Sequence, residues 1–283
     1  MKKTVLVAVT ALALVGSFLG VAEAKEWKEV RIATEGAFPP WNLTKPDGSI
    51  VGFEIDLQQD LCKRMEVKCT IVKQSWDGVI PALLAGKYDA IMSGMSDTAK
   101  REEVIAFSLP YGSTGQTFAV EKDSDLAKAL PMSGEVFNLG NNPEGSQKAV
   151  DTLRPILKGK TIGVQIGSIA AGFLDKYFKD EATIRYYKAT QSHDLDLASG
   201  RVDAIMASTA YVTTAMKEAG NEDMTYVGPR FQGGMLGRGS AVGLRKEDKD
   251  LKAMFDKAIA AANEDGTIKK LAVKWFGFDV SVH

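Results

Sequence analysis

Short apolar runs alternate with longer amphipathic segments along most of the chain. Residues 30–34 and 67–74 are predicted to be strands, because apolar side chains alternate or follow one another there for a few positions. Residues 54–65 lie between them and repeat apolar side chains near the helical period of about 3.6 residues, which predicts a helix. Strands that alternate with helices in this way are typical of an α/β fold, in which helices cover a largely parallel sheet.

The chain contains two copies of one pattern. Residues 86–92 read GKYDAIM, and residues 200–206 read GRVDAIM. In both copies a glycine and a basic residue precede a short buried strand, and small polar residues follow it. Residues 30–36 and residues 160–167 are also similar to each other in sequence pattern. We therefore expect two lobes, each a sheet flanked by helices, with a ligand cleft beyond the carboxyl ends of the strands.

Two crossings are expected to join the lobes as a hinge. The first is the segment 111–120, which is rich in Gly, Ser and Thr, and the second is the segment 226–229. On this division, residues 25–115 and 229–283 form the first lobe, and residues 116–228 form the second. A hinge of two strands permits closure of the lobes around a small ligand.

The first 24 residues have the pattern of a cleaved signal peptide. Lys2 and Lys3 form a basic start, residues 4–19 are mostly apolar, and residues 22–24 match a small-x-small cleavage site. No later stretch is long and apolar enough to span a bilayer. We expect a soluble, monomeric protein in the periplasm. The formal charge of −1 gives no indication of a nucleic-acid partner.

Cysteine and histidine usage limits the chemistry further. Cys62 and Cys69 lie seven residues apart, and after a signal peptide such a pair favours a disulfide between a helix end and the next strand. Only His193 and His283 occur, and no cluster of His and Cys has metal-ligand spacing. We therefore expect no metal and no cofactor. His193 lies in the polar run QSHD and is expected to be a solvated or capping residue.

Residues 89–101, DAIMSGMSDTAKR, are expected to bind an anionic group of the ligand. The strand ends in Ser93, Gly94 and Ser96, whose backbone N–H groups can turn toward an anion where a helix begins. Arg101 follows one turn later, and its planar guanidinium suits a carboxylate. Taken alone, Arg101 is explained equally well as a surface residue in an i,i+4 ion pair. The repeated pattern favours the binding role.

Other strand ends supply further candidates. Glu35 and Phe38 follow the first strand, and Trp76 follows a later one, where its indole can stack on a flat or cationic group. From the pattern alone, Phe38 and Trp41 are interpreted more readily as residues of the core or of a packed loop than as ligand platforms. Gln116, in the first crossing, is a candidate polar contact. Ser168 stands where a helix begins at the expected cleft.

These motifs resemble the polar amino-acid-binding family of bacterial ABC importers. The resemblance covers nearly all of the mature chain and is closest to the branch that binds lysine, arginine, ornithine, histidine, octopine or nopaline. Its most specific parts are ATEGAFPPW, GFEIDLQQDLCKRMEVKC, WDGVIPAL, DAIMSGMSDTAKR and AVGLRKEDKDLKAMFDKA. It implies a type II periplasmic binding protein fold and delivery of a bound solute to a membrane permease.

The resemblance also implies a role for each matching residue. Arg101 would hold the ligand α-carboxylate, helped by Gly94, Ser96 and the backbone N–H groups near Ser168 and Ile169. Phe38 and Trp76 would sandwich the stem of the ligand. Glu35 would pair with a distal guanidinium or ammonium group.

Two departures from the family pattern narrow the expected ligand. Ser208 stands where relatives that bind free amino acids usually carry an Asp as counter-ion to the α-ammonium. Ile169 replaces the usual Thr, which removes a hydroxyl but keeps the backbone donor. A ligand with a second substituent on its α-nitrogen would tolerate both changes. We therefore expect an arginine-derived opine, whose extra carboxylate Gln116 or Ser168 would receive; free lysine, arginine, ornithine or histidine is the alternative.

Two other classes of protein use the same fold. An exported enzyme such as a dehydratase needs an acid or base in the cleft, and only Glu35 qualifies. Because Glu35 is already assigned to a ligand cation, we expect no catalytic residue. A sensor domain is disfavoured, because the chain ends at His283 without a membrane span or a signalling module.

Overall fold

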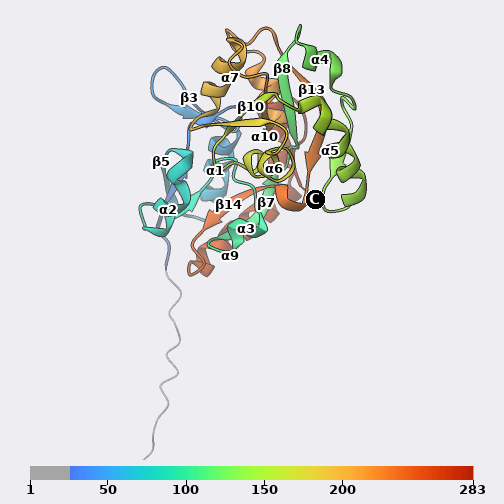
Figure 1. Ribbon diagram of the computed structural model, residues 1–283. Helices are drawn as coiled ribbons and strands as arrows, with labels where there is room; N and C mark the ends of the chain where they lie inside the picture. Colours follow the sequence, from blue (N-terminus) through green and yellow to red (C-terminus); the bar gives the residue numbers. More distant parts are fainter. Residues whose placement is uncertain (1–25, 283) are drawn as a thin grey trace, which may run out of the picture.

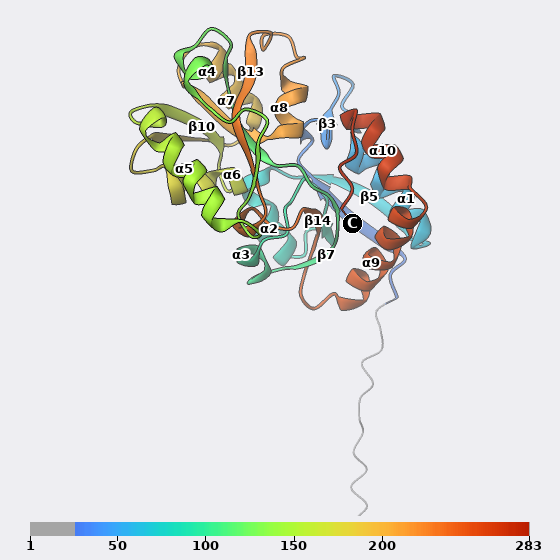
Figure 2. The same cartoon turned by 90° about the vertical axis from the view of Figure 1, so that its right-hand side faces the viewer.

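The computed structural model describes residues 26–282, which form two α/β lobes side by side (Figure 1). The segments near both ends of the chain share one lobe, whereas the middle of the chain forms the other (Figure 2). The expected signal peptide, residues 1–24, lies outside the described residues. Within residues 26–282, no helix is both long and apolar enough to cross a membrane.

The first lobe is built on a sheet of five strands. In spatial order they are β5 (Lys68–Lys73), β1 (Glu29–Thr34), β6 (Ala90–Ile91), β14 (Ser240–Leu244) and β7 (Ala106–Gly112). β1 is parallel to both of its neighbours, and β14 is antiparallel to both of its own. A small sheet comprises β2 (Ala37–Phe38), β3 (Asn42–Thr44) and β4 (Ile50–Val51). The helices are α1 (Phe53–Arg64), the 3-10 turn η1 (Trp76–Gly78), α2 (Val79–Leu84), α3 (Ala99–Glu102), α9 (Lys249–Glu264) and α10 (Thr267–Phe276).

The second lobe is built on a sheet of six strands. In spatial order they are β11 (Thr183–Tyr187), β10 (Thr161–Gln165), β12 (Ala204–Ser208), β8 (Gln116–Glu121), β13 (Met224–Gln232) and β9 (Val136–Asn138). Its helices are α4 (Asp125–Ala129), α5 (Pro143–Leu157), α6 (Ile169–Tyr177), α7 (Thr190–Ala198), α8 (Thr209–Ala215) and the 3-10 turn η2 (Gly234–Leu236).

The repeated motif occupies equivalent places in the two sheets, which confirms that the lobes share one plan. β6 and β12 each lie between a parallel strand and an antiparallel strand. The aspartate of each copy accepts a hydrogen bond from the backbone N–H group of the neighbouring strand. Arg31 donates to Asp89 at 3.0 Å, and Thr161 donates to Asp203 at 2.8 Å. The repeated aspartate therefore fixes strand register and does not line the cleft.

The two connections between the sheets lie at residues 113–115 and 233–239. The return crossing was expected at residues 226–229, and this expectation was wrong, because those residues lie inside β13. Gly228 and Pro229 indicated a break in the chain, but the pairing of β13 with β8 shifts register between Val227 and Phe231. A β-bulge of this kind accommodates Gly and Pro without ending the strand.

Cys62 and Cys69 form a disulfide, as predicted. The bond joins the C-terminal part of α1 to the second residue of β5. Cys62 also belongs to the core of the first lobe, where large side chains of α1 and α9 pack beneath the sheet. The second lobe has a separate core, which includes Phe118, Phe173 and Phe231.

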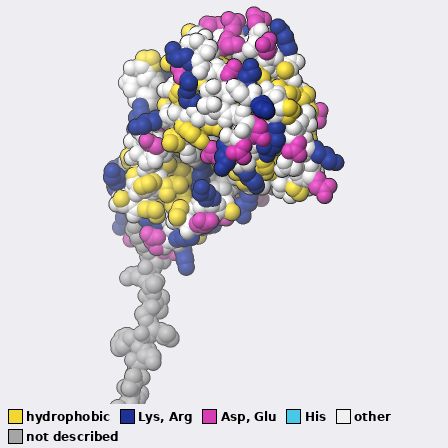
Figure 3. Space-filling view, in the orientation of Figure 1, with side chains coloured by type: hydrophobic (Ala, Val, Ile, Leu, Met, Phe, Trp, Pro, Cys, Tyr) yellow, Lys and Arg dark blue, Asp and Glu magenta, His cyan; other side chains and the backbone are white. Residues whose placement is uncertain are grey.

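Charged side chains of both signs are interspersed on the face shown in Figure 3. Lys and Arg side chains lie among Asp and Glu side chains on both lobes. This face therefore carries no large patch of purely positive or purely negative charge.

Candidate functional site

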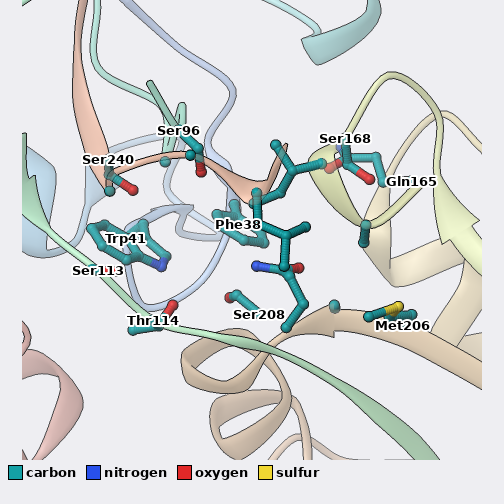
Figure 4. Close-up of a pocket in the computed structure, with 18 of the residues that line it drawn as sticks. Phe38, Trp41, Ser96, Ser113, Thr114, Gln165, Ser168, Met206, Ser208 and Ser240 are labelled. Atoms are coloured by element: carbon teal, nitrogen blue, oxygen red, sulfur yellow. The ribbon is translucent and has the colours of Figure 1, made fainter. Parts of the chain in front are cut away.

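A cavity lies between the two lobes and is lined by residues of both (Figure 4). All eleven residues predicted from the sequence line it. They are Glu35, Phe38, Trp76, Ser93, Gly94, Ser96 and Arg101 of the first lobe, with Gln116, Ser168, Ile169 and Ser208 of the second. Their roles in ligand binding stay a prediction, but the chain does bring them together.

Arg101 lies in the short helix α3 at one wall of the cavity. Thr98 caps that helix, and the Arg101 guanidinium donates to the backbone carbonyl of Ser96 at 2.9 Å and of Gly167 at 3.2 Å. It also lies 5.2 Å from the ring centroid of Trp76. None of the described residues places a carboxylate within ion-pair distance, and burial lowers the pKa of Arg101 to about 10. The surface ion-pair interpretation of Arg101 was therefore wrong, and a charged guanidinium is left without an anionic partner.

Glu35 places a carboxyl group elsewhere in the same cavity. Its side chain is buried and accepts a hydrogen bond from Gln165 of the second lobe at 2.9 Å, while its backbone N–H group donates to Ser93 Oγ at 2.9 Å. Within the described residues, no Lys, Arg or His forms an ion pair with it. Burial raises the pKa of Glu35 to about 7, and the negative charge of Asp77 adds to the shift.

Phe38 and Gly94 pack tightly in the first lobe. A side chain at Gly94 would place its Cβ 2.8 Å from the Phe38 ring, and the backbone φ of Gly94 is +62°. Only glycine fits there without strain. The Phe38 ring reaches the second lobe, where it stacks on Tyr211 with a centroid distance of 5.3 Å and an interplanar angle of 7°.

The second lobe presents two helix N-termini to the cavity. Ser168 caps α6 by accepting from the backbone of Ala171 at 3.1 Å, and Ile169 is the first residue of that helix. Ser208 caps α8 by accepting from the backbone of Tyr211 at 3.2 Å. Each hydroxyl still has its O–H group to donate, but neither carries a charge.

A family model for bacterial extracellular solute-binding proteins, family 3, matches residues 30–278. The chain belongs to this family. An octopine-binding periplasmic protein of Rhizobium meliloti is 48% identical over 93% of this chain and 95% of the relative. An L-arginine-binding protein of Pseudomonas aeruginosa is 33% identical over 99% of this chain and 98% of the relative.

Solved structures agree with this assignment. The crystal structure of a periplasmic His/Glu/Gln/Arg/opine family-binding protein from Silicibacter pomeroyi in complex with lysine is 31% identical to this chain. It matches with a TM-score of 0.71 over 90% of this chain and 100% of that one. This family 3 protein therefore has the type II periplasmic binding protein fold, and the resemblance read from the sequence motifs is confirmed.

His193 is buried in this family 3 protein, so the expectation of a solvated or capping residue was wrong. It is 0% exposed, its Nδ1 lies 2.9 Å from Asp194, and Asp194 also accepts from the Tyr211 hydroxyl. Its Nε2 has no hydrogen-bond partner within the described part of the chain, and His193 lines the cavity. The signal was present in the sequence. Thr190, His193, Asp194 and Leu197 are the buried residues of α7, and they follow i, i+3, i+4, i+7 spacing.

Sequence reasoning also missed lining residues that carry no charge. They include Trp41, Ser113, Thr114, Gln165 and Ser240, whose positions Figure 4 shows. No local pattern distinguishes such residues from ordinary loop and strand residues.

The buried carboxylate of Glu54 links, through hydrogen bonds, the loop after β1 and the loop after β6, which carry predicted binding residues. Glu54 is 0% exposed and accepts hydrogen bonds from the backbone of Gly94 at 2.7 Å and from the Tyr111 hydroxyl. Its other oxygen accepts from Asn42 at 2.8 Å, and Asn42 in turn accepts from the backbone of Gly36 at 2.8 Å. Burial raises the pKa of Glu54, and these donors oppose the shift. The loops that carry Glu35 and Ser93 are thereby fixed relative to each other.

We predict that Glu54→Gln destabilises the first lobe by about 1–3 kcal/mol, because an amide nitrogen cannot accept a hydrogen bond and must face one of the three buried donors. Urea unfolding measures the loss. Glu29→Gln is the control, because the Glu29 side chain is 65% exposed. Equal stability of the Glu54 and Glu29 variants would contradict the assigned network.

Proposed function

We propose that this protein is the periplasmic binding component of an ABC importer and that its ligand is an arginine-derived opine of the octopine or nopaline type. The observation that carries the proposal is the charge pattern of the cavity. Arg101 and Glu35 both line it without an ion-pair partner among the described residues, and Ser208 contributes no charge. A solute with a carboxylate at one place and a guanidinium at another complements both charges.

The relatives support the ligand class. The relative with 48% identity is named for octopine, and the relative with 33% identity is named for arginine. The neutral Ser208 favours the opine, because a secondary nitrogen with a bulky substituent makes less use of a carboxylate partner than a free ammonium group does. Free arginine is the second candidate ligand.

Closure of the lobes would couple binding to transport. Hydrogen bonds already cross the cavity from Gln165 to Glu35 and from Arg101 to the carbonyl of Gly167. Thr190 and Gln191 both donate to the carbonyl of Ala37, at 3.0 and 2.8 Å. A ligand that contacts both lobes adds to these bonds and stabilises the closed form by its differential affinity. The closed form then presents a surface of both lobes to a membrane permease.

A binding role accounts for Glu35 without catalysis. A carboxyl group with a pKa of about 7 would also suit a general acid or base. A ligand cation beside Glu35 would lower that pKa and keep the carboxylate ionised. We therefore propose that the protein binds its solute without converting it.

Calorimetry tests the ligand order. The protein is unfolded in denaturant with its disulfide intact, dialysed, refolded and titrated with octopine, nopaline and arginine. We expect an opine to bind more tightly than arginine. Tight arginine binding without a response to either opine would reverse the order, and no binding of any of the three would reject the proposed function.

Arg101→Met is expected to weaken opine binding by about 100-fold or more, because the ligand carboxylate loses a charge-assisted hydrogen-bond partner in the cavity. Arg101→Lys keeps the charge but not the planar fork, so we expect an intermediate affinity. Lys100→Met, an exposed neighbour on α3, is the control. Calorimetry measures the affinity of all three variants. An affinity in Arg101→Met equal to that of the wild-type protein would contradict the role assigned to Arg101.

Binding should also depend on pH through Glu35. The folded-state pKa of about 7 lies above the ordinary value of 4.5, so the protein keeps this proton between those pH values. Folding stability therefore falls as pH rises from about 4.5 to about 7, because the unfolded chain loses this proton while the folded protein keeps it, and a ligand cation beside the ionised carboxylate offsets that loss. We expect affinity to be highest above pH 7 and to fall by up to about tenfold per unit below it, with proton release on binding.

Titrations at several pH values, in buffers of different ionisation enthalpy, measure both effects. Glu35→Gln should bind more weakly and lose this pH dependence. This variant therefore tests whether the Glu35 carboxyl is the group responsible for the pH dependence. A wild-type profile that is flat, or one that Glu35→Gln leaves unchanged, would refute the role given to Glu35.

A further inference from the structure

The cavity has a third polar region beside the hinge. Trp41, Ser113, Thr114 and Ser240 line it. Ser113 and Thr114 belong to the first connection between the sheets, and Ser240 pairs with Gly112 where the chain returns. Figure 4 shows these four side chains on one side of the cavity, with Gln165 and Ser168 on the other and Ser208 between them.

Trp41 brings a buried donor to this region. The indole is 1% exposed and packs edge-on against Phe53 and Phe276, with centroid distances of 5.6 and 4.9 Å. Its Nε1–H group has no hydrogen-bond partner in the described part of the chain. Buried indole N–H groups usually have one. In Figure 4 the ring nitrogen lies on the edge that faces Thr114 and Ser208.

The hydroxyl groups of Ser113, Thr114 and Ser240 also make no hydrogen bond to another described residue. They are less enclosed than the indole N–H group, because Ser113 is exposed and Thr114 is half-buried. Among the described residues, Arg101 and Glu35 are the only Asp, Glu, Lys or Arg side chains in the cavity lining, and none of the four residues of this region is acidic. One N–H and several O–H donors without a carboxylate among them suit a group that only accepts hydrogen bonds. A carboxylate is such a group, and several neutral donors can hold it in its charged form.

The position of Ser208 connects this region to the proposed ligand. If the α-carboxylate lies at Arg101 and the guanidinium at Glu35, then the α-nitrogen lies near Ser208, and a substituent on it extends toward Thr114 and Trp41. We infer that this hinge-side subsite binds the carboxylate on the nitrogen substituent of an opine, with Trp41 Nε1–H as the donor that selects it. The inference rests on the proposed function and deepens it.

This assignment differs from the expectation drawn from the sequence. Ser168 was one of two residues expected to receive the extra carboxylate, but it caps α6 and lies across the cavity beside Gln165. Gln116, the other, pairs with Ser208 across β8 and β12 and remains next to the path of the substituent.

Trp41→Phe tests the inference, because phenylalanine keeps an aromatic ring against Phe53 and Phe276 but has no N–H group. We expect octopine affinity to fall by about 10- to 100-fold, the loss typical of one hydrogen bond to a charged group, and arginine affinity to stay within about twofold. Trp275→Phe is the matched control, because the Trp275 indole donates to Asp56 outside the cavity. It should change neither affinity.

A second measurement covers the case in which Trp41→Phe folds poorly. In the wild-type protein labelled with ¹⁵N-tryptophan, octopine should shift the Trp41 indole resonance downfield, and arginine should not. Thr114→Val should lower octopine affinity selectively, in the same direction as Trp41→Phe.

The outcomes separate this inference from the proposed function. Wild-type binding of octopine with no selective loss in Trp41→Phe or Thr114→Val, or with an unshifted indole resonance, rejects the hinge-side subsite and leaves the proposed function standing. Failure of the wild-type protein to bind octopine, nopaline or arginine rejects both.

Discussion

Arg101 and Glu35 place a guanidinium and a carboxyl group in one cavity, and neither group has a counter-ion within residues 26–282. A buried, unpaired charge is costly, and the shifted pKa values of both groups express that cost. The two charges are also kept apart, so they cannot neutralise each other. The arrangement is therefore best explained by a solute that supplies both counter-charges at once.

The rest of the first lobe holds these charges in place. Glu54 ties the loop after β1 to the loop after β6, so the segments on which Glu35 and Gly94 lie share one anchor. The second lobe supplies neutral partners, such as Gln165 and the carbonyl of Gly167. This division suits closure, since neutral hydrogen bonds across the gap form and break at lower cost than ion pairs.

Much of the fold and of the cavity could be predicted from the sequence. The repeated DAIM pattern predicted two lobes of one plan. The rule that ligands bind beyond the carboxyl ends of strands predicted that Glu35, Trp76 and Arg101 line the cleft. The return crossing was misplaced because Gly228 and Pro229 indicate a break, whereas tertiary pairing absorbs them in a bulge of β13. Local composition could not reveal that. Trp41 was assigned to the core or a packed loop, because only the packed structure shows that its N–H group is buried at the cavity without a hydrogen-bond partner in residues 26–282.

A crystal structure of the protein with octopine tests the central claim most directly. The account predicts that the α-carboxylate lies within about 3 Å of the Arg101 guanidinium nitrogens and that the octopine guanidinium lies within about 3 Å of the Glu35 carboxylate. A ligand bound in the reverse direction, or one whose charged groups contact neither Arg101 nor Glu35, would contradict it.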